Sequence, residues 1–284
     1  MNKNPLTNRS LELTIESYYP SLTKSEKKVA DFIIHKGDGI LYYSITDFSE
    51  EAYVSESTIL RFCRRIGMKG YQDFKLTLAK GLAETSDISN EQNDKETDYV
   101  DLISGNTIKA IQNMSVLVNR EDLEDAVDLI YKAKSVYFFG VGTSGLTALD
   151  AKNRFIRVGK TVDGVMDPHI QAMIAATLTE DDVVVGISVS GSTQDTIDSL
   201  KIARKNGAKI IALTYYLRSP ITKLADIVLP AGEKESPLEG GSLAAKIAQL
   251  YMVDLLCTGM VMKNKDYYLR MKEKTADAVV NKIL

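Results

Sequence analysis

The chain has 284 residues, of which 44% are hydrophobic and 26% charged, and its formal net charge is −3. This length predicts about two domains with ordinary cores, and the slightly acidic balance excludes a wholly basic nucleic-acid coat while leaving room for a local basic face. Cys63 and Cys257 lie far apart with no CxxC pair, which argues against a zinc knuckle or a disulfide scaffold and suits a reducing cytoplasm. We assign neither cysteine a role.

No segment predicts export or membrane insertion. Residues 1–10 are polar and lack the apolar stretch of a secretory signal. The longest apolar run, 250–262, is interrupted by Asp254 and is too short to cross a bilayer. We therefore expect a cytoplasmic protein without a membrane partner.

Residues 1–83 predict a domain of short helices. Thr23 to Glu26 forms a capping-box pattern in front of a helix that ends at Gly37, and residues 44–47 repeat the pattern before a second helix. Ser55 is placed to cap a third helix, and a fourth is expected over residues 71–81. The apolar residues of the third helix recur at helical spacing and predict its buried face: Ile59, Phe62, Cys63 and Ile66.

The opposite face of the third helix is polar and basic. A short helix with this pattern, preceded by a tight turn, is suited to enter a major groove of DNA, where arginines read guanine or clamp phosphates. The expected contacts to a double-stranded DNA operator are Ser55, Ser57, Thr58, Arg61, Arg64, Arg65 and Lys69. Bases outnumber acids by only ten to eight over residues 21–80, so a helical dimerisation module with a solvated charged face is the alternative.

Residues 84–98 hold six acids and one base, which predicts a solvated linker between a first domain at 1–83 and a second at 99–284. After a helical stretch at 99–118, helices and strands alternate. Apolar strands alternating with helices predict an α/β fold with a parallel sheet covered on both faces. The expected strands are 135–139, 161–165, 183–188, 209–214 and 227–230, and the expected helices are 123–133, 145–158, 169–178, 193–206 and 243–262, followed by a charged C-terminal helix.

Two short turns rich in hydroxyls and glycine each follow a predicted strand and precede a predicted helix. They are Gly-Val-Gly-Thr-Ser-Gly at 140–145 and Ser-Val-Ser-Gly-Ser-Thr at 188–193. Helix N-termini offer unpaired backbone N–H groups and the positive end of a dipole, so two such turns side by side predict a phosphate site. Their hydroxyls suit a polyol, and the ligand class they indicate is therefore a phosphosugar.

Two alternatives stay open for these turns. The first turn also satisfies GxGxxG, and Asp163 falls near the end of the next strand, where a dinucleotide fold places a ribose-binding acid. The serines and threonines of the second turn are also suited to capping its helix.

The sequence at 54–75, Val-Ser-Glu-Ser-Thr-Ile-Leu-Arg-Phe-Cys-Arg-Arg-Ile-Gly-Met-Lys-Gly-Tyr-Gln-Asp-Phe-Lys, closely resembles the helix-turn-helix segment of RpiR-family bacterial transcriptional regulators. Segments 140–145, 182–193, 207–214 and 219–226 resemble the sugar isomerase (SIS) domain. This resemblance implies a five-stranded parallel sheet in a three-layer, flavodoxin-like arrangement, with a phosphosugar bound by the two turns. The residues it implicates in binding are Ser144, Ser188, Ser190, Ser192 and Thr193, with Thr143 as a further candidate.

An aldose–ketose isomerase needs a positioned base, and the candidates in this chain are His35, His169 and Glu239. We assign none of them a catalytic role and expect no metal or cofactor, but we keep Glu239 as a sugar contact. The sequence thus predicts a DNA-binding regulator of carbohydrate metabolism, a homodimer or homotetramer whose operator affinity responds to a phosphosugar. A phosphosugar isomerase or lyase with an appended helical module is the first alternative, and a dinucleotide-binding regulator is the second.

Overall fold

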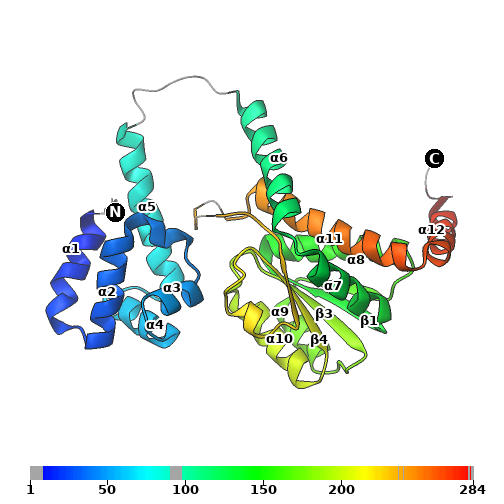
Figure 1. Cartoon of the computed structure of the whole chain (residues 1–284), viewed down its shortest axis with the longest axis horizontal. Helices are drawn as coiled ribbons and strands as arrows, with labels where there is room; N and C mark the ends of the chain where they lie inside the picture. The colour runs from blue at the N-terminus through cyan, green and yellow to red at the C-terminus, as the bar shows by residue number, and fades with distance from the viewer. Residues whose placement is uncertain (1–8, 90–97, 236, 239, 281, 283–284) are drawn as a thin grey trace. The chain divides into compact units, whose positions relative to one another are not determined.

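The computed structural model of the protein describes residues 9–89, 98–235, 237–238, 240–280 and 282. The chain divides into two compact units, and Figure 1 shows the elements of each. The first unit comprises residues 1–102 with 234–242, and the second comprises residues 103–233 and 243–284.

The first unit is built of short helices: α1 (Arg9–Tyr18), α2 (Lys24–Lys36), α3 (Ile45–Glu51), α4 (Glu56–Arg65) and α5 (Tyr71–Ser89), with 3₁₀ turns at Tyr19–Ser21 and Gly37–Tyr42. The predicted capping box is present, since the Thr23 side chain accepts from the N–H of Glu26 and the Glu26 carboxylate accepts from the N–H of Thr23. Ser44 and Ser55 cap α3 and α4, since each side chain accepts from the backbone N–H three residues further on.

Two features of this unit differ from the sequence prediction. Helix α1 was not predicted, yet it buries Leu11 and Ile15 in the core of the unit. Helix α5 continues to Ser89, eight residues beyond the predicted end at Gly81, and so extends into the predicted linker. An acidic and polar composition does not prevent a helix that is already nucleated from continuing.

Aromatic packing joins the helices of the first unit around α4. The rings of Phe32 and Phe48 stack with centroids 4.8 Å apart, and Tyr71 lies 5.8 Å from Phe48. The predicted buried face of α4 is confirmed, because its four apolar residues are at most 4% exposed. Cys63 belongs to this core, and its burial raises the pKa of its thiol to about 12.

The second unit is a five-stranded parallel sheet in the order β2-β1-β3-β4-β5. Its strands are β1 (Ser135–Phe139), β2 (Val162–Val165), β3 (Asp182–Ile187), β4 (Lys209–Thr214) and β5 (Ile227–Pro230). Its helices are α6 (Tyr99–Leu117), which begins at the edge of the first unit, α7 (Arg120–Lys132), α8 (Gly142–Arg157), α9 (Pro168–Ala175), α10 (Gln194–Lys205), α11 (Leu243–Lys263) and α12 (Lys265–Val280). The α/β prediction is confirmed, with element ends within about three residues of those expected.

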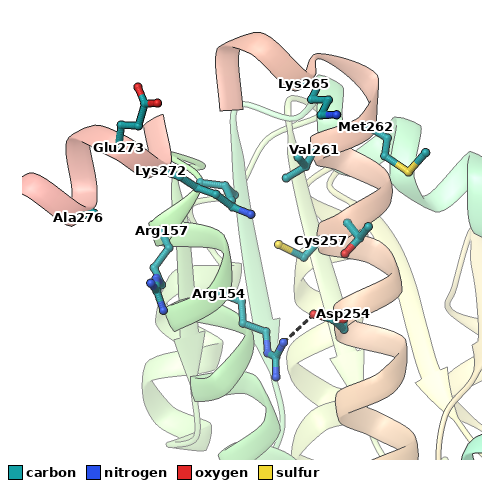
Figure 2. Close-up of a pocket in the computed structure, with 12 residues that line it drawn as sticks. Arg154, Arg157, Asp254, Cys257, Val261, Met262, Lys265, Lys272, Glu273 and Ala276 are labelled. Carbon is teal, nitrogen blue, oxygen red and sulfur yellow. Dashed lines mark hydrogen bonds and ion pairs between the residues drawn. The ribbon is translucent and has the colours of Figure 1, made fainter. Parts of the chain in front are cut away.

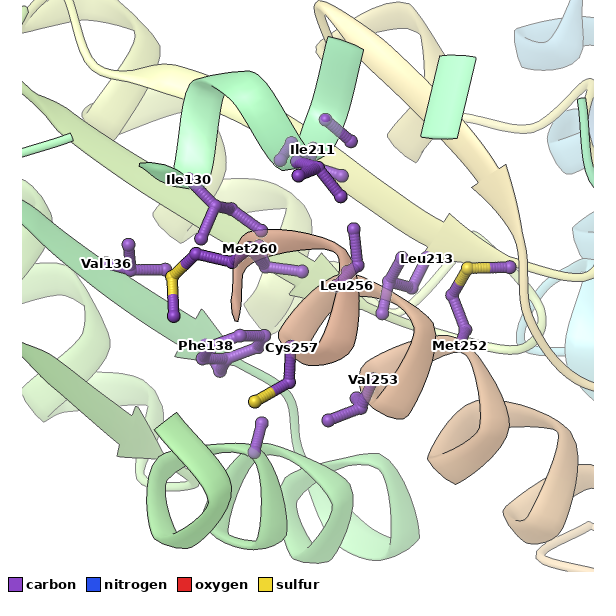
Figure 3. Packing of buried hydrophobic residues seen from close by; sticks show 14 of the residues in the cluster. Ile130, Val136, Phe138, Ile211, Leu213, Met252, Val253, Leu256, Cys257 and Met260 are labelled. Carbon is purple, nitrogen blue, oxygen red and sulfur yellow. The ribbon is translucent and has the colours of Figure 1, made fainter. Parts of the chain in front are cut away.

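Helices cover the sheet on both faces and make three layers. Alternation along the strands separates two cores, since Val136 and Phe138 of β1 join one cluster while Phe139 joins the other. Helices α7, α8 and α11 pack on the first face, and α9 and α10 pack on the second. Figure 3 shows Leu256 and Met260 of α11 lying against Ile211 and Ile130 in the first core.

Helix α11 is the one helix in the described ranges that is long and apolar enough to cross a membrane by length and composition. Its apolar residues are explained by the core, because Met252, Leu256 and Met260 are fully buried between the sheet and its neighbouring helices. Burial raises the pKa of the Cys257 thiol, also on α11, to about 11.

Candidate functional site

The two predicted turns meet at one edge of the sheet, at the carboxyl ends of β1 and β3. Residues 140–145 lead from β1 into α8, and residues 188–193 lead from β3 into α10. The two strands are direct neighbours, with Phe139 paired to Gly186. The chain passes from β1 to β2 on one side and then to β3 on the other, and ligands of open parallel sheets bind at such a switch point.

The N-termini of α8 and α10 differ from those of five other helices of the chain. Helices α2, α3, α4, α7 and α9 each begin at a side chain that accepts a hydrogen bond from a backbone N–H. The N-caps of α8 and α10, Val141 and Thr193, make no such bond. The first-turn N–H groups of these two helices are therefore left without a side-chain cap at the edge where the turns meet, which favours binding of an anion.

The first turn requires glycine where the backbone folds closely. A Cβ on Gly140 would lie 2.8 Å from the carbonyl group of Ser144, and a Cβ on Gly145 would lie 2.7 Å from the Met166 side chain. Buried Gln171 donates to the carbonyl oxygens of Gly140 and Val165 and so ties this turn to the end of β2. Thr143 is exposed on this turn, and Ser144 is 8% exposed.

A buried pair of hydrogen bonds orients the Ser144 hydroxyl. Thr147 Oγ1 donates to Gln249 Oε1 at 2.6 Å, and Gln249 Nε2 donates to Ser144 Oγ at 3.1 Å. The shorter contact fits an O–H donor and the longer one an N–H donor, which supports this orientation of the amide. Since Ser144 accepts from Gln249, its own proton is available to donate to a ligand oxygen.

Lys246 of α11 adds a positive charge that sequence reasoning missed. Its ammonium donates to the carbonyl oxygen of Thr143 at 3.1 Å, which places it beside the first turn. Partial burial lowers the pKa of Lys246, and Asp150 offsets this only in part. No sequence motif marks Lys246 as a site residue, because it is a single lysine near the start of a long apolar helix.

The second turn is held by its own hydroxyls. Ser188 and Thr193 pair with each other at 2.9 Å, and Ser190 Oγ accepts from the N–H of Ser192 at 3.2 Å. Ser188 is 2% exposed, so its hydroxyl braces the turn, while Ser190, Ser192 and Thr193 are partly exposed. The Thr193 hydroxyl does not cap α10, so helix capping does not explain the threonine at this position.

The remaining candidates near this edge are less favourably placed for chemistry. His169 is exposed in the first turn of α9, whose cap is Asp167. Asp163, the ribose-binding acid of the dinucleotide alternative, is paired with Lys152 at 2.7 Å. His35 lies on α2 in the first unit, and Glu239 lies outside the described residues.

In the first unit, α3, a turn and α4 form a helix-turn-helix. Along and beyond α4, the side chains of Ser55, Ser57, Arg61, Arg64 and Lys69 are exposed as predicted. Tyr53, in the turn, is 85% exposed with a φ of 53°, and sequence reasoning did not select it. Tyrosine at such a position is suited to contact a phosphate.

Thr58 and Arg65, also predicted to contact DNA, make contacts within the unit. Thr58 is 4% exposed and accepts from Arg61 at 3.2 Å. Arg65 pairs with buried Glu26 at 3.1 Å and so fixes α4 against the start of α2. Burial alone would raise the pKa of Glu26, but hydrogen bonds from Thr23 together with Arg65 hold it below its ordinary value. These contacts hold α4 in place, and a DNA contact by Thr58 or Arg65 stays a prediction.

Comparison with known proteins supports a helix-turn-helix domain in the first unit and a SIS domain in the second. Residues 9–85 match the helix-turn-helix domain of the rpiR family, and residues 129–259 match the SIS domain. A Haemophilus influenzae protein named as an uncharacterized HTH-type transcriptional regulator is 40% identical over 275 residues, covering 94% of this chain and 95% of its own. The chain therefore belongs to the RpiR family of helix-turn-helix transcriptional regulators, and its biochemical role is to bind DNA and regulate transcription.

Other relatives extend this comparison. Bacillus subtilis YbbH, also named as an uncharacterized HTH-type regulator, is 31% identical and covers 93% of this chain and 95% of its own. The Bifunctional protein glk of Burkholderia thailandensis is 35% identical over 86% of this chain, which corresponds to only 38% of that longer protein. Among solved structures, Vibrio vulnificus NanR complexed with ManNAc-6P superposes with a TM-score of 0.88 at 28% identity, covering 96% of this chain and 99% of its own.

Proposed function

We propose that the second unit binds a phosphorylated sugar across the turns 140–145 and 188–193, and that this binding changes the affinity of the first unit for a palindromic operator. The observation that carries the proposal is the pair of adjacent helix N-termini whose side chains provide no cap. Their N–H groups would receive the phosphate. The similarity to NanR, whose structure contains ManNAc-6P, supports the same ligand class.

The side chains at this edge have distinct roles in the proposal. Ser144 donates to the phosphate because Gln249 holds its oxygen as an acceptor. Lys246 supplies a charge for the anion. Thr143, Ser190, Ser192 and Thr193 contact phosphate or sugar hydroxyls, Ser188 braces the turn, and Glu239 stays a prediction for a sugar hydroxyl.

The sugar-phosphate site at the two turns serves sensing, and the protein acts in the cytoplasm as a homodimer or homotetramer. Relatives across almost the whole chain are named as transcriptional regulators. His169 is exposed at a helix start, and among the residues that the structure describes no contact orients it as a general base. Among the proposed DNA contacts, Ser57, Arg61 and Arg64 face the bases, while Ser55, Lys69 and Tyr53 lie closer to the DNA backbone.

The domain limits 1–83, 84–98 and 99–284 stay a prediction.

A panel of hexose and hexosamine phosphates, including ManNAc-6P, tests this function by thermal shift and then by operator binding. At least one sugar phosphate is expected to raise the melting temperature and to change operator affinity, and the unphosphorylated sugar is expected to do neither. Turnover of the same compounds without any effect on DNA would instead support an isomerase.

Replacing Gln249 with glutamate is expected to weaken sugar-phosphate binding about 10-fold to 100-fold, the loss of one charge-assisted hydrogen bond. The carboxylate accepts from both Thr147 and Ser144, so the Ser144 proton turns away from the phosphate. Isothermal titration measures the effect, with far-UV circular dichroism to confirm folding. Thr147→Ser, which keeps the donor to residue 249, is the matched control and should retain the wild-type affinity. Equal affinity in Gln249→Glu would contradict the proposed orientation of Ser144.

A further inference from the structure

Residues 234–242 lie between β5 and α11 and belong to the first unit, although both of these elements belong to the second. We call these residues the connecting segment. Glu233, the last residue of the second unit before it, accepts from Asn113 Nδ2 on α6 at 3.1 Å. The next residue, Lys234, lies in the first unit, with its ammonium nitrogen 3.6 Å from the centre of the Tyr42 ring. Two consecutive residues are thus held by different units.

The chain just before the connecting segment packs on the second ligand turn. Buried Gly232 has a φ of 132°, and a Cβ on it would lie 3.1 Å from the Val189 side chain. Val189 stands within the turn 188–193, and its carbonyl oxygen accepts from the N–H of Tyr215 at 3.1 Å. Close-packed interiors transmit displacements from one group to the next. A movement of this turn therefore displaces Gly232, which is only two residues before Lys234.

The chain just after the connecting segment contacts the first ligand turn. Helix α11 begins there, and Lys246 near its start donates to the carbonyl oxygen of Thr143 at 3.1 Å. A phosphate bound at the turns competes for this ammonium, because a charged acceptor binds it more strongly than a carbonyl oxygen does. The two ends of the segment are also tied together, since the N–H of Ser242 donates to the Glu235 carboxylate at 2.8 Å. The segment therefore adjoins both turns of the proposed sugar site.

In the first unit, Tyr42 lies directly before the helix-turn-helix. It is the last residue of a 3₁₀ turn, and Ser44, two residues further on, caps α3. Tyr43, between them, is fixed to α5, because its carbonyl oxygen accepts from the Tyr71 hydroxyl at 3.0 Å. A displacement of Tyr42 therefore acts on the start of α3, the helix that precedes α4 in the helix-turn-helix.

We propose that the contact between Lys234 and Tyr42 transmits sugar-phosphate binding from the two turns to the helix-turn-helix, which makes Lys234 a positioning residue for DNA binding. This inference rests on the proposed function and adds the route of its regulation. Binding draws Lys246 toward the phosphate and moves the connecting segment, so the Lys234 ammonium shifts relative to the ring. The energy of a cation–π contact depends on where the charge lies over the ring, so the arrangements with and without ligand differ in energy.

The test is the ratio of operator affinities with and without one sugar phosphate, the compound that binds the wild type most tightly in the panel that includes ManNAc-6P. Lys234→Ala removes the charge and is expected to bring this ratio closer to 1 by about 2-fold to 5-fold per chain, the contribution of one exposed cation–π contact. Tyr42→Leu removes the ring and should have the same effect. Lys234→Arg keeps a cation over the ring and should keep the wild-type ratio. Sugar-phosphate affinity of the free protein should be retained, because neither residue lies in the two turns.

Lys265→Ala is the matched control, since it removes the same charge from an exposed residue of the second unit. Lys265 begins α12 and lines a groove between α8, α11 and α12 (Figure 2). It follows the far end of α11, a helix of 21 residues that is roughly 30 Å long and begins at the connecting segment. This variant should keep the wild-type ratio, and far-UV circular dichroism confirms that each variant is folded.

The outcomes separate this inference from the proposed function. A double variant of Lys234→Ala and Tyr42→Leu that changes the ratio no further than either single variant would support the contact as the route. If the wild type responds to the sugar phosphate and either single variant responds equally, the contact does not carry the coupling, and the proposed function stands without it. A wild type whose operator affinity does not change with any sugar phosphate of the panel overturns both.

Discussion

Arg61→Ala is expected to reduce operator affinity by about 2–6 kcal/mol, or roughly 30-fold to 10⁴-fold. One bidentate arginine contact with a guanine contributes about 1–3 kcal/mol, and a two-fold complex loses it at both half-sites. Arg61 is exposed on α4, opposite its buried face, and its one described contact, to Thr58, is local. Fluorescence anisotropy with an operator duplex at fixed salt measures the loss.

Arg120→Ala is the matched control for this prediction, because it removes the same charge from an exposed helix residue in the second unit. It should leave operator affinity within about 2-fold, since a surface charge that makes no contact with the DNA acts mainly through screened electrostatics. Sugar-phosphate affinity should be unchanged in both variants. If Arg61→Ala bound the operator as well as the wild type does, α4 would not be the recognition helix.

Gly191→Ala is expected to abolish sugar-phosphate binding, with a loss of more than about 100-fold, because the second turn cannot keep its shape. Gly191 has a φ of 61°, which disfavours any side chain, and a Cβ there would overlap Ser219 Oγ and lie 3.0 Å from Thr214 Oγ1. The turn must then move away from β4, and its N–H groups no longer point to the same place as those of α8. Isothermal titration with the sugar phosphate measures the effect.

Gly207→Ala controls for backbone strain. Gly207 also has a positive φ, 94°, but a Cβ there would lie 3.6 Å from Glu180, in ordinary contact, and the residue follows the far end of α10. This variant is expected to lose about 1 kcal/mol of stability and to keep ligand affinity. Retention of sugar-phosphate binding by a folded Gly191→Ala chain would show that the second turn is not part of the site.

The fold was largely predictable because its signals are local. Strands of consecutive apolar residues such as 183–187, buried throughout β3, and caps such as Thr23 and Ser55 have short sequence signatures. Helix α1 escaped prediction because its buried residues, Leu11 and Ile15, form one short turn-spaced pair whose partners lie elsewhere in the unit.

The site was predictable to the level of its turns and not beyond. The hydroxyl-glycine pattern located the edge of the sheet. The role of each side chain, however, depends on partners that are far away in the sequence. Gln249 orients Ser144 from 105 residues away, and Glu26 engages Arg65 from 39 residues away. Thr58 and Ser188 were selected for their chemistry, but packing buries both, which the local sequence did not indicate. No periodicity or motif encodes such partners.

The most direct test of the coupling between the two units is a pair of titrations with one sugar phosphate, chosen as the strongest in the thermal-shift panel. Its affinity is measured for the free protein and for the protein saturated with operator duplex, and operator affinity is measured with and without the sugar phosphate. Linkage requires the two ratios to be equal, and we expect a common factor of about 5 to 150. A sugar phosphate that binds the free protein and the operator complex with the same affinity would contradict the account.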